Sequence, residues 1–201
     1  TLTTTPSASG GVVIDGTTTG GPGDVNFAAG VRIIWTDNNS GSDQDALFTV
    51  HADRDINALD DVLIQHSEVG DGTTTFVDGE GGVVFLAGRD INIGSATMRT
   101  GGVAIGSEFG SNLFVAGDSD FNNFADSGGT YAGDGDINVT GGDAAAAFAQ
   151  LGYIIKQARA NGSGNDFSDG SGNHAFNGSL LVRAGGSVRL TGGDEALSFA
   201  Q

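Results

Sequence analysis

The chain is a series of short apolar runs separated by Gly, Asp and Asn, without long amphipathic segments. Several runs alternate. In DINI at 90–93 and DINV at 136–139, the Ile and Val residues fall on one side and the Asp and Asn residues on the other. This two-residue period is typical of a β-strand with one buried face. The pattern therefore predicts an all-β chain of short strands joined by tight turns.

A motif built on this alternation recurs along the chain. It is an apolar strand that ends in Ala, a tight polar or glycine pair, and a second strand. The four clear copies carry their alanine at Ala52, Ala87, Ala132 and Ala184, and a degenerate copy surrounds Ala116. One such strand pair cannot bury its apolar face alone, but parallel stacking of successive copies gives a continuous narrow core. The repeats therefore favour a parallel β-helix, a β-solenoid.

A second repeat supports the same interpretation. The string TGGDAAAAFAQ at 140–150 returns as TGGDEALSFAQ at 191–201, an offset of 51 residues. Its glycines suit corners between strands, because Gly takes positive φ without steric cost. The irregular spacing of the copies predicts loop insertions, which we place at 107–130 and 157–178. We expect one β-solenoid domain over residues 1–201.

Two segments fit the repeat less directly. Residues 1–44 depart from it, although VVID, VNFAAG and VRIIWTD read as strands, so this part is either the first turns of the solenoid, a cap or an insertion. Residues 144–160 follow Asp143, a good helix N-cap, and contain an alanine run that favours a helix by propensity. Gly152 interrupts that run, and the sister copy follows the same TGG turn. We therefore expect a strand there, with a helix as the alternative.

Composition narrows the classes of partner. The chain carries 25 acidic and 8 basic residues, a net charge of −17, so nucleic acid and anionic membrane surfaces are unfavourable partners. No stretch approaches 18 apolar residues, and the first residues lack a signal peptide. Because the chain begins at Thr1 and ends at Gln201, we expect a processed product or an excised piece. The absence of Cys excludes disulfides and thiolate metal sites.

Carboxylates are the only abundant reactive groups. Paired acids occur at Asp53/Asp55, Asp60/Asp61, Asp118/Asp120 and Asp134/Asp136. Such pairs could serve as glycosidase acids or as calcium ligands. The GGTYAGDGD string at 128–136, which contains Asp134 and Asp136, weakly resembles a Gly- and Asp-rich calcium repeat. The calcium candidates are the two pairs Asp118/Asp120 and Asp134/Asp136. The alternative interpretation is structural, because Asp and Asn suit the polar outer face and the turns of a solenoid.

Other catalytic patterns are missing from the sequence. His51, His66 and His174 are far apart and show no metal-ligand spacing. The chain has neither a GxSxG elbow nor a GxxxxGK[ST] phosphate loop. We therefore expect no enzymatic activity and no cofactor other than possible calcium ions.

Three strings resemble the passenger repeats of filamentous haemagglutinin-like exoproteins: AGRDINIGSA, RAGGSVRLTGGD and GGDAAAAFAQLGY. The resemblance covers roughly residues 45–201. It implies a right-handed parallel β-helix, secretion from Gram-negative bacteria by a two-partner or related route, and a role as an adhesin or biofilm matrix component at the cell surface. These motifs specify architecture better than function.

The leading expectation is a structural segment of a secreted adhesin that gives a rigid stalk, with loops that contact glycans or proteins of cell surfaces or matrix. One alternative is a filament subunit that stacks head to tail, because a β-helix exposes unpaired strand edges at both ends. A second alternative is a polysaccharide-degrading enzyme on the same fold. That activity needs a groove of acids with a basic residue, and the sequence clusters no Lys or Arg with its acids.

Overall fold

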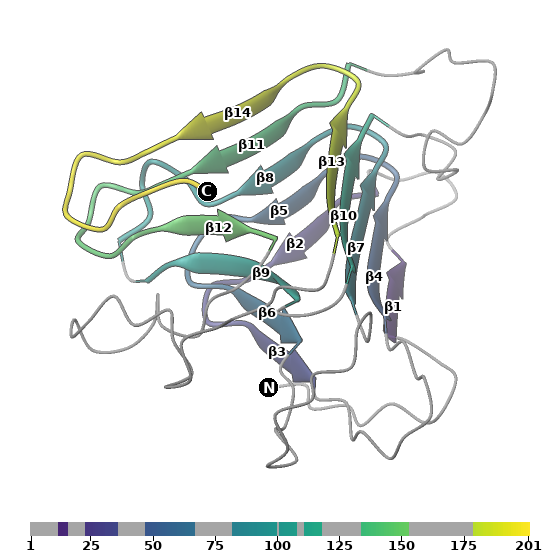
Figure 1. The fold of residues 1–201 in the computed structure, drawn as a ribbon, viewed down its shortest axis with the longest axis horizontal. Coiled ribbons are helices and arrows are strands. Elements are labelled where there is room, and N and C mark those ends of the chain that lie inside the picture. The colour runs from purple at the N-terminus through teal and green to yellow at the C-terminus, as the bar shows by residue number, and fades with distance from the viewer. Residues whose placement is uncertain are drawn as a thin grey trace.

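All regular elements in the described part of the chain are β-strands. The computed structural model describes residues 12–15, 23–35, 47–66, 82–99, 101–107, 111–117, 134–152 and 179–201. Its strands form three sheets, and all neighbouring strands are parallel (Figure 1). The all-β prediction is confirmed for these residues.

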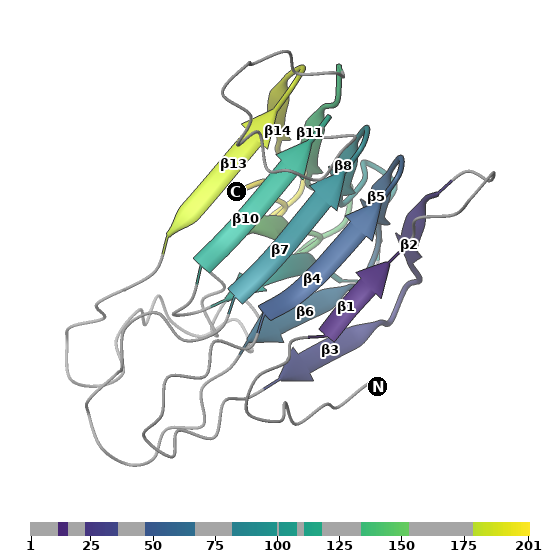
Figure 2. The ribbon, with the colours of Figure 1, turned by 90° about the vertical axis from the view of Figure 1, so that its right-hand side faces the viewer.

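The first sheet has the order β1 (Val12–Asp15), β4 (Leu47–Ala52), β7 (Gly82–Ala87), β10 (Ser111–Ala116), β13 (Leu180–Ala184). The second sheet, read from the same end, has the order β2 (Val25–Phe27), β5 (Ile56–Ala58), β8 (Ile91–Ile93), β11 (Ile137–Thr140), β14 (Val188–Thr191). The third sheet has the order β3 (Arg32–Trp35), β6 (Leu63–His66), β9 (Val103–Ser107), β12 (Ala149–Leu151). Figure 2 shows the five strands of the first sheet side by side.

The chain passes through the three sheets in turn and then starts again one strand further along each sheet. We call one such pass a rung. Rung 1 is β1–β2–β3, rung 2 is β4–β5–β6, rung 3 is β7–β8–β9, and rung 4 is β10–β11–β12. Rung 5 contains β13, β14 and Ala200, which forms a parallel bridge to Ala149. Neighbouring rungs are therefore joined through all three sheets.

Segment 1–44, which departs from the sequence repeat, contributes a complete rung. β1, β2 and β3 pair in parallel with β4, β5 and β6. The predicted strands VVID, VNFAAG and VRIIWTD each contain one of these strands. Of the alternatives that the sequence left open, the structure shows the first rung of the stack.

The repeated alanines align in the first sheet, with one correction. Ala52 pairs with Ala87, Ala87 with Ala116, and Ala116 with Ala184. Ala116, treated as a degenerate extra copy, holds the alanine position of rung 4, and Ala132 lies outside the described residues. The two sequence copies thus form one rung, whose first strand is β10 and whose second strand is β11.

The same finding corrects one predicted loop. The proposed insertion 107–130 contains β10, so residues 111–116 are a strand. Its remainder from 118 to 130, and the whole of 157–178, lie outside the described residues. The prediction failed because the chain between Ala116 and Asp134 separates the two halves of one motif.

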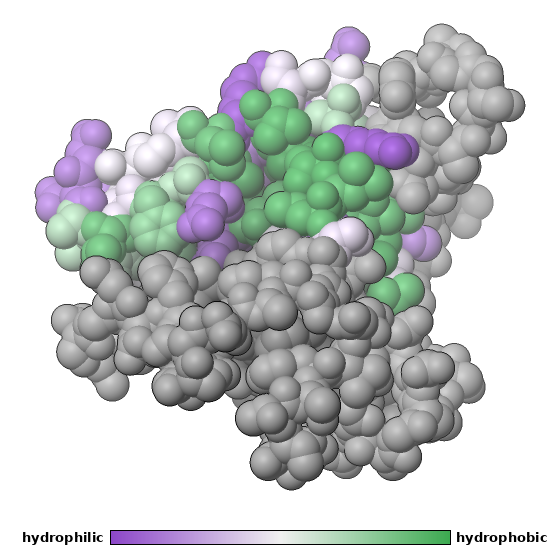
Figure 3. All heavy atoms as spheres, viewed as in Figure 1, coloured by the Kyte–Doolittle hydropathy of each residue, from purple (hydrophilic) through white to green (hydrophobic). Residues whose placement is uncertain are grey.

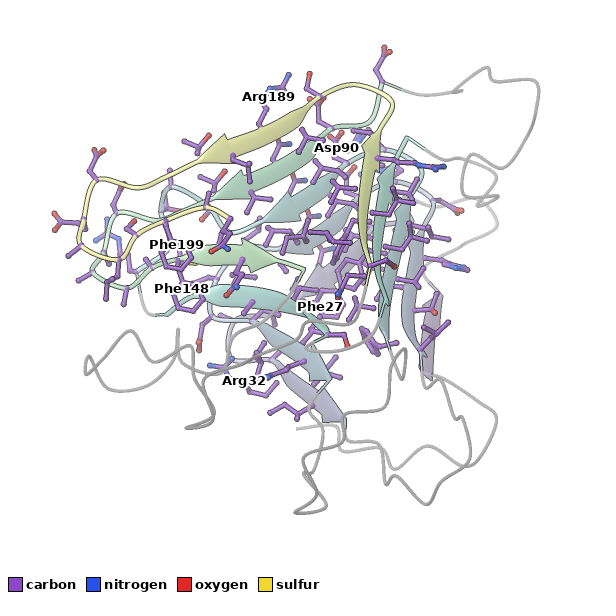
Figure 4. All side chains as sticks on the ribbon, viewed as in Figure 1. Phe27, Arg32, Asp90, Phe148, Arg189 and Phe199 are labelled. Carbon is purple, nitrogen blue, oxygen red and sulfur yellow. The ribbon has the colours of Figure 1, made fainter. Side chains whose placement is uncertain are left out.

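The 51-residue repeat stacks directly on itself. Thr140 pairs with Thr191, and the rings of Phe148 and Phe199 stack with centroids 5.3 Å apart (Figure 4). Within 144–152 the chain forms turns followed by β12, so the expected strand is found at 149–151 and no helix is present in that range; residues 153–160 lie outside the described part.

Alternate residues of the strands build the core between the three sheets. Phe85 is fully buried, and its ring centroid lies 5.6 Å from that of Phe114, 6.1 Å from Phe27 and 6.5 Å from Phe48. The second sheet adds a fully buried column of Ile56, Ile91 and Ile137 in register. Phe85 therefore links the aromatic side chains of several rungs.

Phe85→Ala should lower the free energy of unfolding by about 3–5 kcal/mol, because it removes the ring at the centre of this aromatic cluster and leaves a cavity. Urea denaturation followed by circular dichroism measures the change. Leu181→Ala is the matched control, since Leu181 is exposed on β13 and should change stability by no more than about 0.5 kcal/mol. Equal losses in the two variants would contradict this account of the core.

Candidate functional site

A column of aspartates follows the corner between the first and second sheets. Asp24, Asp55, Asp90 and Asp136 each stand immediately before the second-sheet strand of rungs 1 to 4, and Ser187 holds this position in rung 5. The corner places these residues above one another because the strands that follow them pair in register. We call this column the aspartate ladder.

Each carboxylate of the ladder accepts a hydrogen bond from the backbone of the next rung. The Oδ1 atoms of Asp24 and Asp55 accept from the N–H groups of Asp55 and Asp90 at 3.3 Å. Oδ1 of Asp90 accepts from Asp136 N–H at 2.8 Å, and Oδ1 of Asp136 accepts from Ser187 N–H at 2.7 Å. The ladder thus satisfies corner N–H groups and links all five rungs.

Arginines from the rung above neutralise three of the four carboxylates. Arg54 donates to Asp24 through Nε at 3.0 Å and Nη2 at 2.9 Å. Arg89 binds both oxygens of Asp55, with Nε at 2.7 Å. Such bidentate pairs combine charge attraction with fixed geometry.

The arginine pattern changes at rung 4. Gly135 stands where Arg54 and Arg89 stand in rungs 2 and 3, so Asp90 receives no arginine from the rung above at that position. Nε of Arg89, in the same rung, lies 3.8 Å from Oδ2 of Asp90. Asp136 is again paired, with Arg189, which projects from β14 away from the core (Figure 4).

These contacts lower the pKa of two carboxyl groups, those of Asp55 and Asp136. Burial acts to raise the pKa of Asp55, but the hydrogen bonds from Arg89 and from the Asp90 N–H outweigh it and leave the pKa below its ordinary value of 3.8. The hydrogen bond from Arg189, supported by the Ser187 N–H, lowers the pKa of Asp136. Both aspartates are therefore held in the charged form.

A column of asparagines runs along the outer side of the second sheet. Nδ2 of Asn57 donates to Oδ1 of Asn26 at 2.9 Å, Nδ2 of Asn92 to Asn57 at 2.9 Å, and Nδ2 of Asn138 to Asn92 at 3.0 Å. In rung 5 the position belongs to Arg189, whose Nη1 donates to Oδ1 of Asn138 at 3.5 Å. The alternation within the DIN motif therefore places Ile in the core and Asn in the asparagine column on the outer side of the sheet.

Two of the four predicted calcium ligands belong to the described residues. Asp134 is exposed at the corner and Asp136 belongs to the aspartate ladder, whereas Asp118 and Asp120 lie outside the described residues. Across the described ranges, no three His, Cys, Asp or Glu side chains form a group that could hold a metal ion. Calcium binding by the four aspartates stays a prediction.

The other singled-out groups also lie apart. Asp61 pairs with Arg32, and the two residues join rungs 1 and 2 near the third sheet. His51 is half-buried in β4, while the side chain of His66 and all of His174 lie outside the described part. The geometry of the described polar groups is therefore suited to holding rungs together.

The last rung presents an apolar surface. Val188 and Leu190 of β14 are 49% and 61% exposed, although the residues directly below them, Ile137 and Val139, are fully buried. Figure 3 shows apolar side chains gathered on this face. We call the inward-facing side chains of rung 5 the end surface: Val182, Ala184, Val188 and Leu190.

The cross-rung Arg–Asp pairs correct the expectation that no Lys or Arg clusters with the acids. Within one copy of the motif, Arg54–Asp55 and Arg89–Asp90 read as neighbours in a turn. Their actual partners are one rung away, so Arg89 binds Asp55. Aligning the RD dipeptides of the copies was the available signal, because a shared register puts each arginine over the preceding aspartate.

Comparisons with family models, curated proteins and solved structures find no match to this chain. The described ranges contain no helix with the length and apolarity needed to traverse a lipid bilayer. Function must therefore be inferred from the stack and its surfaces.

Asp55→Asn should reduce stability most at neutral pH. Since the pKa of Asp55 is lowered in the folded protein, its contribution is present above the ordinary carboxyl pKa and is lost as the pH falls through and below that value. The difference in unfolding free energy between wild type and variant, from urea titrations between pH 7 and pH 2.5, should shrink on acidification. A difference that stays constant with pH would contradict the assignment.

Asn92→Asp should destabilise the protein by about 1 kcal/mol at pH 7, because the carboxylate cannot donate to Oδ1 of Asn57. Protonation of the new carboxyl restores a donor, so the loss relative to wild type should decrease at pH 3. Asn26→Asp is the matched control, since Asn26 accepts from Asn57 and a carboxylate keeps that bond. Thermal unfolding at both pH values measures the effect. Equal losses of stability in the two variants would refute the hydrogen-bond directions assigned to the asparagine column.

Proposed function

We propose that this chain is a segment of a right-handed parallel β-helix that serves as the rigid stalk of a secreted bacterial adhesin or biofilm matrix exoprotein of the filamentous haemagglutinin-like type. The observation that carries the proposal is the stacking of like residues over successive rungs, in the core, in the aspartate ladder and in the asparagine column. Such a stack extends by about 4.8 Å per rung.

The polar contacts support a mechanical role. The Arg–Asp pairs and the corner hydrogen bonds all join one rung to the next. Each of these contacts resists separation or sliding of rungs, which a spacer that holds contact loops away from a cell surface requires. Glycans or proteins of cell surfaces or matrix are the proposed partners, and no catalytic activity is proposed.

Head-to-tail filament assembly is the second candidate. The exposed end surface favours it, because an end-on contact would bury Val188 and Leu190. The other end fits less well, since Val25 and Ile33 of rung 1 are each only 8% exposed. The stalk is therefore the function that the geometry supports better.

Adhesion can be tested with beads coated with the purified chain and passed under flow over immobilised glycans and matrix proteins. The stalk-and-loop function predicts selective retention that is lost when residues 157–178 are replaced by a Gly-Ser linker of equal length. The thermal midpoint of the linker variant must match wild type, so that loss of binding reports on the loop.

Two results would refute this function. Release of reducing sugar from a polysaccharide, abolished by Asp134→Asn with Asp136→Asn, would identify an enzyme. Long filaments of the wild-type chain in negative-stain electron microscopy would identify the filament subunit instead.

A further inference from the structure

Two apolar residues on the outer side of the first sheet are buried. Leu86 of β7 and Val115 of β10 are 6% and 0% exposed. Because side chains alternate along a strand, they point away from Phe85 and Phe114, which lie in the core. The core cluster accordingly contains neither Leu86 nor Val115. Something other than the core must therefore cover these two side chains.

Neighbouring strands do not bury an outward side chain to this extent. Asn92 occupies a comparable outward position in rung 3 of the second sheet and stays half-buried. Along the column of the first sheet, Leu86 pairs with His51 of rung 2, and Val115 pairs with Arg183 of rung 5. Figure 2 views this sheet from its outer side, and no described strand lies in front of it. The apolar, buried positions are thus confined to rungs 3 and 4.

The corner that follows Val115 differs from the equivalent corners of rungs 2, 3 and 5. In those rungs three residues join the first-sheet strand to the second-sheet strand, 53–55, 88–90 and 185–187, whereas in rung 4 the connection runs from 117 to 136. Its two ends lie in contact, because a Cβ atom at Gly135 would be 2.3 Å from the backbone N of Gly117. The segment 118–133 is therefore anchored at both ends next to Val115.

We propose that residues 118–133 pack against the outer side of the first sheet and cover Leu86 and Val115. The segment carries three aromatic residues, Phe121, Phe124 and Tyr131, among polar ones. Aromatic side chains bury large apolar areas, so these three supply the surface that excludes water from the patch. The rung-4 insertion is then a second layer fixed to the stack.

The other segments outside the described ranges fit less well. Residues 1–11, 36–46, 67–81, 108–110 and 153–178 each precede a strand of the first sheet, so they join it at the end opposite to Leu86 and Val115. Residues 16–22, GTTTGGP, follow β1 at the near end but contain no aromatic residue. A second molecule is not needed, since both side chains are buried within a single chain. The inference goes beyond the stalk function and does not depend on adhesion.

Thiol labelling tests the proposal, because the chain contains no Cys of its own. In the otherwise wild-type chain, the Val115→Cys variant should react with a thiol reagent as slowly as the Ala87→Cys variant, since Ala87 lies in the core. Replacement of 118–133 by a Gly-Ser linker of equal length should speed labelling of the Val115→Cys variant at least tenfold. The same replacement should leave labelling of the Ala87→Cys variant within about twofold, because core residues react only when the stack opens.

Two matched controls separate this segment from the rest of the chain. Replacement of 157–178 by a linker of equal length should leave labelling of the Val115→Cys variant slow. Leu181→Cys should react fast in every background, because Leu181 is exposed on β13. Independently of the linker variants, benzoylphenylalanine at position 121 or 124 of the full chain should crosslink to β7 or β10.

Three results would overturn the proposal: fast labelling of the Val115→Cys variant in the wild-type background, slow labelling that persists after 118–133 is replaced, or crosslinks confined to the second and third sheets. Protection of this variant that disappears on dilution would show that a second copy covers the patch, and would likewise overturn the proposal. Loss of adhesion in the bead assay bears only on the stalk function, because the linker variant used there retains 118–133.

Discussion

Parallel hydrogen bonding in register between successive rungs is the constraint on which the rest of the structure depends. Once the strands pair residue for residue, Ile137 must lie over Ile91 and Asn138 over Asn92. Like residues therefore form columns, and each column must be stable when stacked. Apolar columns are stabilised by burial, and in an amide column each side chain can donate a hydrogen bond to one neighbour and accept one from the other. The sequence motif DIN satisfies both requirements within three residues.

A column of like charges is stable only if opposite charges or hydrogen-bond donors offset the repulsion. The corner between the first and second sheets supplies both to the aspartate ladder. Stacked aspartates repel one another, yet Asp24 and Asp55 each accept a backbone N–H and two donors from an arginine of the next rung. The same carboxylates thereby fix the register at the point where the chain changes sheets. Asp90 shows the limit of this arrangement, because Gly135 occupies the arginine position above it.

Much of the fold follows from local sequence, and the side-chain pairings do not. Alternation and the repeat of 51 residues predicted strands and parallel stacking, because register converts repetition into columns. Ala116, which the sequence presented only as a degenerate copy, continues the alanine column in rung 4, because an intervening segment separates β10 from β11 and sequence distance does not show which alanine continues a column. Arg89 and Asp55 belong to different copies of the motif, so no single copy contains the pair. Of the calcium candidates, Asp134 and Asp136 alone belong to the described residues, so calcium binding stays a prediction.

The pairing of arginines within the chain also affects the electrostatic repulsion between separate molecules. Within the described residues, Arg32, Arg54, Arg89 and Arg189 are paired with carboxylates of their own chain. The surface left to neighbours is dominated by acid, so parallel molecules crowded on one surface should behave as a polyelectrolyte brush. Their lateral spacing then depends on ionic strength, and at about 0.1 M salt the repulsion extends over roughly 10 Å. The same distribution of charge thus stabilises the contacts between rungs within one molecule and causes repulsion between neighbouring molecules.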